Sequence, residues 1–400
     1  MKILLISQYF YPENFKINDL IFSLKERGHE VTVLTGKPNY SKTNFFEGYG
    51  WKSNDFEIIN NIPVYRANLF SRRNGGPIRL FLNYISFAVL ALIKVRKIKG
   101  SFDVIFVYQT SPVTVGIPAV YAKNLFKTPI YFWVQDLWPE SLAAAGGIKN
   151  KIILGFFNSL TKWIYKHSRK VLIQSNGFRE YIQNQGVPSN KIIFYPNPTE
   201  GFYKPLKKVK EYQEFFQNRF FNIVFAGNIG EAQSFKTIID AINNIKELPI
   251  RVTVLGDGRY KETALSLIKE KGLESRFNFI GSYPPTEMPK FFSHSDALLV
   301  SLKKSKIFSL TIPAKIQSYL ACGKPIIASI DGSGAKIVAD AKCGLVSPAE
   351  DSLILSENIK KLMNLDKHSV QEMGVNGRKY YEKKLDREYL LKKLEFIFNS

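Results

Sequence analysis

Residues 308–327, FSLTIPAKIQSYLACGKPII, predict a loop, a helix and a buried strand in succession. Pro313 suits the first turn of a helix, because its missing N–H would have had no partner there. Gly323 and Pro325 end the helix, since glycine favours the residue just past a helix and proline cannot continue it. Between them, apolar side chains recur at helical spacing, at Ile316, Tyr319 and Leu320. This succession of helix and buried strand is typical of an α/β domain.

Lys315 lies in the first turn of this predicted helix. A helix start gathers free N–H groups and the positive end of the helix dipole, so it attracts an anion. A lysine at that place is mildly unfavourable for the helix alone. The position therefore indicates a bound phosphate. The alternative is an exposed lysine on a helix that otherwise faces the core.

The preceding hundred residues repeat one pattern, in which a buried strand runs into a glycine-rich turn. Glycine lets a backbone approach a phosphate closely and present its N–H groups to it. One such turn is a weak signal, but several in series before Lys315 can converge on one ligand. The candidate residues in these turns are Gly227, Asn228, Gly230, Gln233, Gly256, Asp257, Gly258, Ser282 and Tyr283.

The first half of the chain has the same organisation. It opens with a strand at 2–7, a helix at 17–27 and a strand at 30–35, an order that favours a parallel sheet. No G-x-G-x-x-G follows the first strand, which disfavours a dinucleotide-binding enzyme. We therefore expect two successive α/β domains at 1–200 and 201–382. A helix at 383–400 is expected to pack back toward the N-terminal domain.

Polar residues follow two strands of this first domain. The stretch PIYFWVQDLWPES (129–141) is a strand that runs into a turn with Gln135, Asp136 and Glu140. Residues just past the carboxyl ends of parallel strands line the ligand crevice in such sheets. The alternative is that Asp136 or Glu140 caps the following helix. The loop after the first strand, QYFYPENFK, adds Glu13 and Asn14 as candidates.

Charge restricts the partners. The 400 residues carry 56 Lys plus Arg against 34 Asp plus Glu, a formal net charge of +22, which favours an anionic partner. The two cysteines have no metal-ligand spacing and suit a reducing compartment. The N-terminus does not have the length of a signal peptide.

Two segments, 78–99 and 149–170, hold five and six basic residues and no acidic one. The apolar middle of the first is 14 residues long and includes Asn83 and Ser86, so we expect no segment of the chain to span a bilayer. Each segment fits either a helix buried against the sheet or an amphipathic helix at a membrane interface.

The chain resembles retaining glycosyltransferases of the GT-B fold, in family 4. The resemblance rests on GHEVTVLTG, VQDLWPE, FYPNP, FAGNIGEAQSF, VLGDG, FIGSYP and IPAKIQSYLACGKPII, and is strongest to the WbuB-like and colanic-acid branches, which build O-antigen and capsule repeats. It implies an α/β protein of two Rossmann-like parallel-sheet domains facing across a cleft. It also implies a nucleotide sugar in the C-terminal domain, an acceptor at the N-terminal domain and no divalent metal.

The resemblance assigns donor-binding roles residue by residue. The family's phosphate-binding arginine and lysine fall on Asn228 and near Gln233, which are neutral, so Lys315 and the backbone of Gly230 gain importance. The family's two glutamates fall on Ser309 and Gln317, and Pro313 between them is a further donor-binding candidate. Gln317 would hold ribose hydroxyls, while Ser309 implies a deoxy or N-acetylamino-deoxy sugar of the FucNAc type. The segment with Ser282 and Tyr283 would bind the base, with uracil favoured over guanine.

On the acceptor side the resemblance assigns Glu13, Asn14, Gln135 and Glu140, with Gln135 at the family's histidine position. Lys315 and helix N-termini would stabilise the departing diphosphate. The departing phosphate oxygen would take the acceptor's proton, and Asp136 would position the acceptor hydroxyl. The implied acceptor is a saccharide on undecaprenyl diphosphate, so the enzyme would lie in the cytoplasm, peripherally on the inner face of the plasma membrane.

Two alternatives come from other classes. A sugar-nucleotide 2-epimerase shares the fold but needs acid–base carboxylates and histidines, and none of the four histidines lies near these turns. A nucleic-acid-binding protein would explain the +22 charge. However, the basic residues lie beside long apolar runs rather than in an arginine-aromatic surface.

Overall fold

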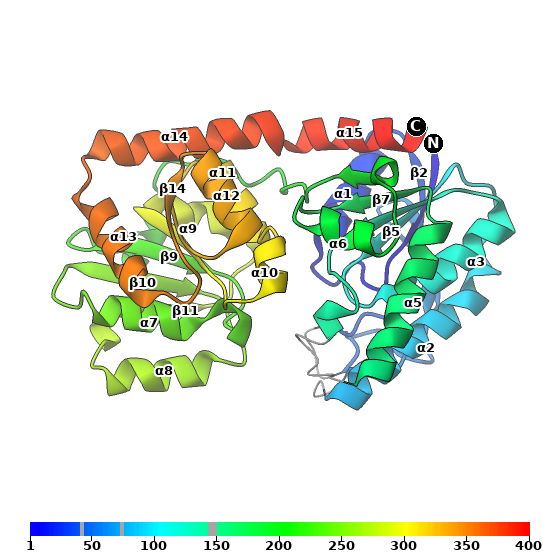
Figure 1. The fold of residues 1–400 in the computed structure, drawn as a ribbon, viewed down its shortest axis with the longest axis horizontal. Coiled ribbons are helices and arrows are strands. Elements are labelled where there is room, and N and C mark those ends of the chain that lie inside the picture. Colours follow the sequence, from blue (N-terminus) through cyan, green and yellow to red (C-terminus); the bar gives the residue numbers. More distant parts are fainter. Residues whose placement is uncertain (41–43, 73–75, 143–149) are drawn as a thin grey trace. The chain divides into compact units, whose positions relative to one another are not determined.

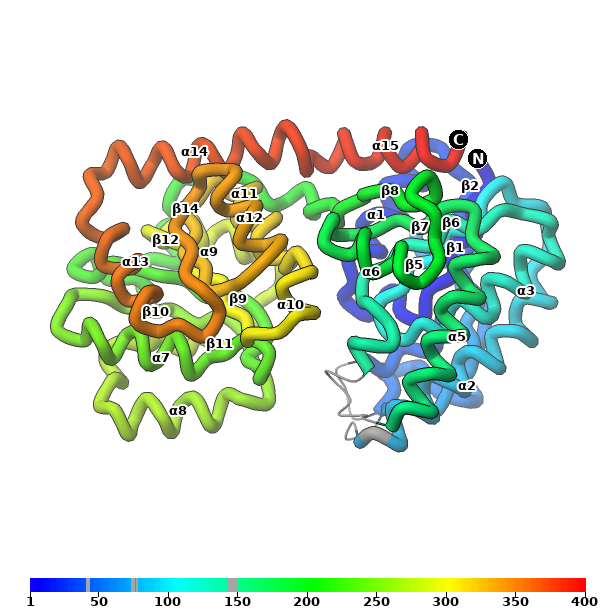
Figure 2. Tube along the Cα trace, in the orientation of Figure 1, coloured from blue at the N-terminus to red at the C-terminus, as the bar shows by residue number. Residues whose placement is uncertain are grey.

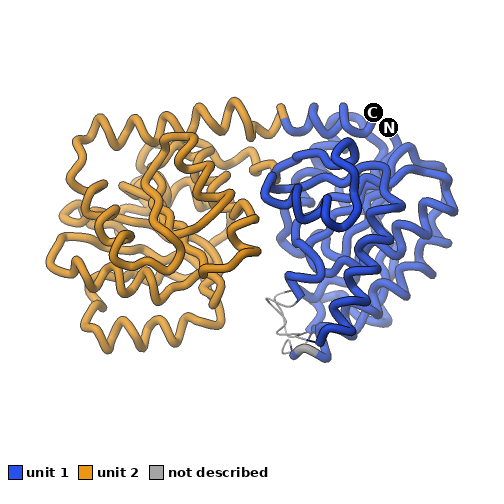
Figure 3. Tube along the Cα trace, in the orientation of Figure 1, with its two compact units in different colours: residues 1–196, 390–400 blue, residues 197–389 orange. Residues whose placement is uncertain are grey.

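The computed structural model describes residues 1–40, 44–72, 76–142 and 150–400 (Figure 1). It divides into two compact units, which Figure 3 shows in separate colours. Unit 1 comprises residues 1–196 and 390–400, and unit 2 comprises residues 197–389. Both ends of the chain therefore belong to unit 1 (Figure 3), and Figure 2 traces the course of the chain from one end to the other. The sequence had placed the domain boundaries after residues 200 and 382, whereas the units change after residues 196 and 389.

Unit 1 is built on one sheet with the strand order β3-β4-β2-β1-β5-β6-β7-β8 over its described residues. All neighbouring strands are parallel except the pair β3 and β4. The strands are β1 (Lys2–Ile6), β2 (Glu30–Gly36), β3 (Phe56–Ile59), β4 (Ile62–Ala67), β5 (Val104–Gln109), β6 (Ile130–Val134), β7 (Lys170–Ile173) and β8 (Ile192–Phe194).

Helices cover this sheet, and the last segment of the chain completes its core. Leu390, Leu394 and Phe398 are buried with strand residues of β1, β5 and β6. The hydroxyl of Tyr131 donates to the carbonyl of Phe398 at 3.1 Å. The helices are α1 (Lys16–Glu26), α2 (Pro77–Val95), α3 (Gly116–Phe126), α5 (Lys151–His167), α6 (Phe178–Asn184) and α15 (Arg387–Asn399), which belongs to unit 1 from Leu390 onward.

Unit 2 has a parallel sheet with the order β11-β10-β9-β12-β13-β14. Its strands are β9 (Phe221–Ala226), β10 (Ile250–Leu255), β11 (Phe277–Gly281), β12 (Ala297–Ser301), β13 (Ile326–Ser329) and β14 (Gly344–Ser347). Its helices are α7 (Phe235–Asn243), α8 (Lys261–Glu270), α9 (Met288–His294), α10 (Lys306–Leu310), α11 (Ala314–Ala321), α12 (Gly332–Asp340), α13 (Ser352–Asn364) and α14 (Lys367–Lys384). The strand order reverses direction at β9 and β12, so their carboxyl ends form a topological switch point, where α/β sheets bind ligands.

The prediction of two parallel-sheet α/β domains is confirmed, with two local differences. The antiparallel strand β3 was not predicted, although Asn60 and Asn61 adopt the left-handed conformation (φ 48° and 59°) that a tight hairpin requires. The predicted loop before Pro313 is partly helical, because α10 spans Lys306–Leu310. Ser309 therefore lies in a helix rather than in a loop.

Helix α2 corrects the expectation that no segment is long and apolar enough to span a membrane. Among the described residues it passes that test by length and composition, with a mean hydropathy of 1.8 over Ile78–Val95. The expectation failed because it counted only the 14 residues 80–93, whereas the 18-residue window adds Ile78 and Val95 and tolerates the two basic residues at 79 and 94. One face of α2 is packed, since Asn83, Phe87 and Ala91 are fully buried. A helix with one buried face passes the same test as a spanning helix, so the finding is weak evidence for a span.

Candidate active site

The glycine turns of unit 2 pack backbone against backbone. A Cβ added to Gly256 would lie 2.0 Å from the carbonyl oxygen of Gly227, and one added to Gly258 would lie 2.3 Å from that of Ile229. Gly227 and Gly256 also have φ values of 129° and 137°, which other residues rarely adopt. The N–H of Gly227 donates to Leu255 O at 2.7 Å. The two turns after β9 and β10 therefore form one rigid wall that requires glycine.

The ammonium group of Lys315 lies against this wall. The residue is partly accessible, but its Nζ atom is enclosed and has no hydrogen-bond partner among the described residues. Nζ lies 3.6 Å from the centre of the Phe225 ring, and a Cβ on Gly227 would come within 3.0 Å of it. Burial lowers the pKa of Lys315 to about 7. An enclosed cation with no partner is costly, so the arrangement suits an anion that is not part of the chain.

Asn228 and Gln233 bond to each other and to the turn between them. The side-chain oxygen of Gln233 accepts the backbone N–H of Gly230 at 3.1 Å and the amide of Asn228 at 3.4 Å. The Gly230 N–H, which the sequence suggested for phosphate binding, is therefore already occupied. A ligand reaches it only by displacing Gln233.

The other predicted donor residues are spread more widely. Asp257 accepts the N–H of Gly258 at 2.8 Å, which stabilises the turn. Ser282 is exposed, and the Tyr283 ring packs edge-on against Phe291 at 4.7 Å. The hydroxyl of Ser309 donates to Lys306 O at 2.8 Å within α10.

Gln317 is not brought together with Lys315. The two residues lie on α11, which begins after Pro313, but two positions along a helix correspond to roughly 200° of rotation. Gln317 is fully buried, and neither amide atom has a hydrogen-bond partner in the part of the chain that the structure describes. Its side chain is thus a second unsatisfied polar group, on another side of the same helix.

A polar pocket beside the glycine turns was not predicted. Its volume is about 420 Å³, and Ser234, Lys303 and Glu350 line it. Ser234 and Glu350 adopt the left-handed conformation (φ 44° and 64°). The carboxylate of Glu350 accepts the Ser234 hydroxyl at 3.4 Å and the Lys304 N–H at 3.1 Å, so it ties together the segments after β9 and β12. Strained backbone of this kind is common near binding sites.

In unit 1, Asp136 follows β6 as predicted and is held by a residue that the sequence analysis missed. Its Oδ2 accepts the hydroxyl of Ser111 at 2.9 Å, and Ser111 accepts the indole N–H of Trp138 at 3.2 Å. Burial raises the pKa of Asp136, against the opposing effect of the Ser111 hydrogen bond. Ser111 follows β5, the neighbouring strand, so its position at a carboxyl end was the signal that could have identified it.

Glu13 lies after β1, at the same edge of the sheet. One carboxylate oxygen accepts the N–H groups of Asn39 and Tyr40 at 2.8 and 2.6 Å, and the other is buried with no partner among the residues described. Burial raises the pKa of Glu13 to about 7. Asn14 is exposed. Nearby, the Arg72 guanidinium packs against the rings of Tyr9, Tyr40 and Tyr84, a cluster that sequence spacing did not show.

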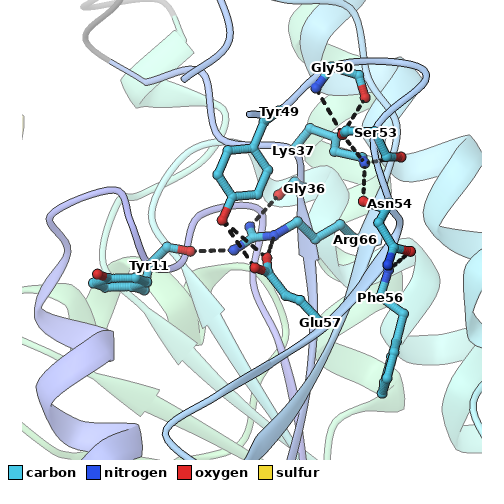
Figure 4. A network of polar contacts seen from close by, with 10 residues as sticks. All are labelled: Tyr11, Gly36, Lys37, Tyr49, Gly50, Ser53, Asn54, Phe56, Glu57 and Arg66. Carbon is cyan, nitrogen blue, oxygen red and sulfur yellow. Dashed lines mark hydrogen bonds and ion pairs between the residues drawn. The ribbon is translucent and has the colours of Figure 1, made fainter. Parts of the chain in front are cut away.

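The loops around Glu13 are fixed by two buried cations, drawn in Figure 4. Arg66 is ion-paired with Glu57, donates to the carbonyls of Gly36 and Tyr11, and lies 4.8 Å from the Tyr49 ring. Lys37 donates to the carbonyls of Ser53 and Asn54 and to the Ser53 hydroxyl. These bonds anchor residues 49–57 beside β2 and β4.

The two remaining acceptor-side candidates have structural contacts. Gln135 is buried, and its N–H donates to Gln109 O at 2.8 Å. Glu140 accepts the hydroxyl of Tyr181. No cluster of three His, Cys, Asp or Glu side chains suited to a metal occurs among the described residues.

Comparison with known proteins identifies the family to which this chain belongs. Residues 207–380 match the model for glycosyl transferases group 1, and residues 16–198 match the glycosyl transferase 4-like domain. The two matches fall one on each unit. The chain is a glycosyltransferase of the GT-B fold. The enzyme is 23% identical to the putative colanic acid biosynthesis glycosyl transferase WcaI of Escherichia coli, over 98% of each chain.

Two other similarities concern a relative and a fold. The enzyme is 24% identical to a Campylobacter jejuni N-acetylgalactosaminyltransferase named as acting on N-acetylgalactosamine-N,N'-diacetylbacillosaminyl-diphospho-undecaprenol, over 88% of this chain and 91% of that one. Its structure resembles Anabaena HepE, solved in complex with UDP and glucose, with a TM-score of 0.73, 14% identity and full coverage of both chains. That likeness shows the fold alone.

Proposed function

We propose that this glycosyltransferase moves a sugar from a nucleoside diphosphate, with UDP favoured, to a saccharide carried on undecaprenyl diphosphate. The observation that carries the proposal is the Lys315 ammonium, enclosed without a partner against the glycine turns at the switch point of unit 2. A diphosphate would supply the missing negative charge. The C. jejuni relative, whose name includes a diphospho-undecaprenol substrate, supports the acceptor class. O-antigen or capsule synthesis is the process that fits such an acceptor.

The proposed mechanism retains the anomeric configuration. The bond between the anomeric carbon and the phosphate oxygen breaks, the acceptor oxygen bonds to the same face, and its proton passes to the departing phosphate oxygen. Lys315 and the helix N-termini stabilise the charge that develops on the diphosphate. Asp136, oriented by Ser111, accepts a hydrogen bond from the acceptor hydroxyl and positions it. We propose that no divalent metal is needed, so EDTA should leave turnover unchanged.

The donor sugar is proposed to be a deoxy or N-acetylamino-deoxy sugar, because a serine, Ser309, stands where the family has a carboxylate. A thermal-shift screen against UDP-, GDP- and dTDP-sugars tests the donor, since a ligand that binds only the folded chain raises the melting temperature. A shift with UDP-sugars alone is expected. Absence of any shift at millimolar concentrations would contradict the proposal.

Turnover tests the chemistry. Asp136→Asn should lower kcat about a hundredfold and leave the UDP-sugar Kd unchanged, because the acceptor hydroxyl loses its carboxylate partner. Glu26→Gln is a matched control, because Glu26 is an exposed carboxylate at the end of α1, and it should keep most of the activity. Labelled donor distinguishes the reaction from epimerisation: transfer to a lipid is expected, whereas an isomerised nucleotide sugar would contradict it.

We further propose that the enzyme is cytoplasmic and binds peripherally to the anionic inner face of the plasma membrane through α2 and α5. Neither helix contains an acidic residue. The basic side chains of α5 are Lys151, Lys162 and Lys166, whereas α2 contributes Arg79, because its Lys94 is buried and paired with Asp55. Each basic side chain near an anionic surface contributes about 1 kcal/mol, and this attraction is screened by salt. Binding to anionic vesicles should therefore weaken as salt is raised.

A further inference from the structure

Helices α2 and α5 border an apolar groove that the proposed reaction does not explain. They lie next to each other in unit 1 (Figure 1), and the groove has a volume of about 640 Å³. Among the residues that the structure describes, four isoleucines and three phenylalanines line it, with no polar side chain. Ile152, Ile78 and Phe156 are 84, 76 and 62% exposed. Contiguous exposure of such side chains usually marks an interaction surface.

The groove is not a packing fault of α2. The opposite face of that helix is fixed, because Asn83, Phe87 and Ala91 are fully buried. The Asn83 amide also donates to Asn39 Oδ1 and Phe70 O at 3.0 and 2.7 Å. The exposed face of α2 is therefore held outward by contacts within unit 1.

Helix α5 carries basic side chains beside its apolar stripe. Ile152, Phe156 and Trp163 are spaced four and seven residues apart, so they share one side of the helix. Lys151 and Lys162 are exposed along the neighbouring side. An apolar stripe with tryptophan and flanking lysines is typical of a helix that lies in a membrane interface.

The charge distribution selects the occupant. A second copy would bring two chains of net charge +22 together, and like charges oppose such contact. An acidic protein surface would pair with the lysines. However, its polar side chains would find no partner in the groove, which only apolar groups can fill. An anionic bilayer satisfies both features, because its phosphates meet the lysines and its hydrocarbon chains meet the groove.

We propose that the α2–α5 groove takes up hydrocarbon chains at the surface of an anionic bilayer, with Ile78, Ile152 and Phe156 inserted and Lys151 at the lipid phosphates. This inference specifies the surface for the peripheral attachment proposed above. It also adds a component to that attachment: hydrophobic contact is not screened by salt, so part of the binding persists at high ionic strength.

Vesicle sedimentation tests the groove directly. The full chain is mixed with phosphatidylglycerol–phosphatidylethanolamine vesicles at low salt and at 1 M salt, without donor or acceptor. The double variant Ile152→Ser, Phe156→Ser should bind about tenfold more weakly at low salt and lose the salt-resistant fraction, because two large apolar contacts are removed. The matched control is Phe396→Ser, since Phe396 is 74% exposed on α15 of the same unit. It should bind as the unchanged chain does.

A labelled cysteine gives a second measurement. Both native cysteines are buried, and burial raises the pKa of each to about 12, so they react poorly with thiol reagents. Phe156→Cys can therefore be labelled selectively with a polarity-sensitive dye. Its emission should shift to the blue with anionic vesicles and remain unchanged for a dye at Phe396→Cys.

Several outcomes would overturn the inference. If the double variant binds like the unchanged chain, the groove is not the contact, although salt-sensitive attachment can still hold. If ultracentrifugation without lipid shows a dimer that Phe156→Ser abolishes, the occupant is a second copy. If alkaline carbonate fails to extract the protein, α2 spans the bilayer. If the unchanged chain binds no vesicles, the inference and the peripheral attachment both fail, while the thermal-shift screen still decides the transferase proposal.

Discussion

Arg66 in unit 1 and Lys315 in unit 2 are both enclosed cations near the carboxyl ends of parallel strands, but only one has partners. Arg66 is satisfied by a carboxylate and two backbone carbonyls, supplied from three separate parts of the chain. The ammonium of Lys315 has a ring and a glycine turn beside it and no acceptor. The contrast teaches that enclosure alone does not indicate function. A satisfied cation holds loops together, whereas an unsatisfied one marks a place for a ligand.

The largest expected effect is on stability, at Arg66. Arg66→Met should lower the free energy of unfolding by about 3 kcal/mol, because Glu57 and two carbonyls lose their partner. Denaturant unfolding measures the change. Arg66→Met combined with Glu57→Leu should recover part of the loss, since no unpaired charge then remains. A loss below about 1 kcal/mol would show that the network in Figure 4 is not structural.

Lys315 should show the opposite behaviour. Lys315→Met should weaken UDP binding about thirtyfold, which corresponds to one charge-assisted contact, and should not lower the melting temperature of the free enzyme. Calorimetric titration with UDP measures the affinity. Lys336→Met is the matched control, because Lys336 is 75% exposed on α12 and pairs only with Asp340 in the described structure. Unchanged UDP binding by Lys315→Met would remove the basis of the proposed function.

The pH dependence of stability and of UDP affinity is a further test of the unpaired state of Lys315. The pKa of Lys315 in the folded chain is about 7, below the 10.5 of an exposed lysine. Between these values the unfolded chain binds more protons, so the stability contributed by this group rises with pH. A bound diphosphate favours the charged form, and UDP affinity should therefore fall about tenfold from pH 7 to 8.5.

Titration at pH 8 in buffers of different ionisation enthalpy should detect proton uptake on UDP binding. In Lys315→Arg, which stays charged, both the uptake and the loss of affinity above pH 7 should vanish. Proton uptake that persists in that variant would assign the titration to another group.

The smallest effect is expected at Gln317, the other unsatisfied group on α11. Gln317→Met should raise the free energy of unfolding by about 1 kcal/mol, because a buried amide without partners is replaced by an apolar side chain of similar length. UDP affinity should not change, since Gln317 lies on another side of the helix from Lys315. A loss of affinity would instead support the ribose-binding role that the resemblance implies.

Local patterns in the sequence were enough to predict the two parallel sheets and the glycine turns. Buried strands, helix ends and close backbone contacts leave signals within a few residues, as at Gly227 and Gly256. The partners of Arg66 could not be predicted, because they come from residues 11, 36 and 57. The same holds for Ser111 and Asp136, which neighbouring strands bring together. For Gln317, a match along the sequence gave a role, but the full burial of its amide without a partner among the described residues became visible only in three dimensions.

The packing of residues 390–400 has a consequence for biosynthesis. Leu390, Leu394 and Phe398 are needed in the core of unit 1, yet a ribosome makes them after all of unit 2. The core of unit 1 therefore keeps apolar surface uncovered until residues 390–400 have been translated. A chain stopped after residue 389 should bind the dye ANS and be cut rapidly by proteases, and a synthetic peptide of residues 390–400 should reverse both effects. Early termination would in this way yield a product that quality-control proteases remove.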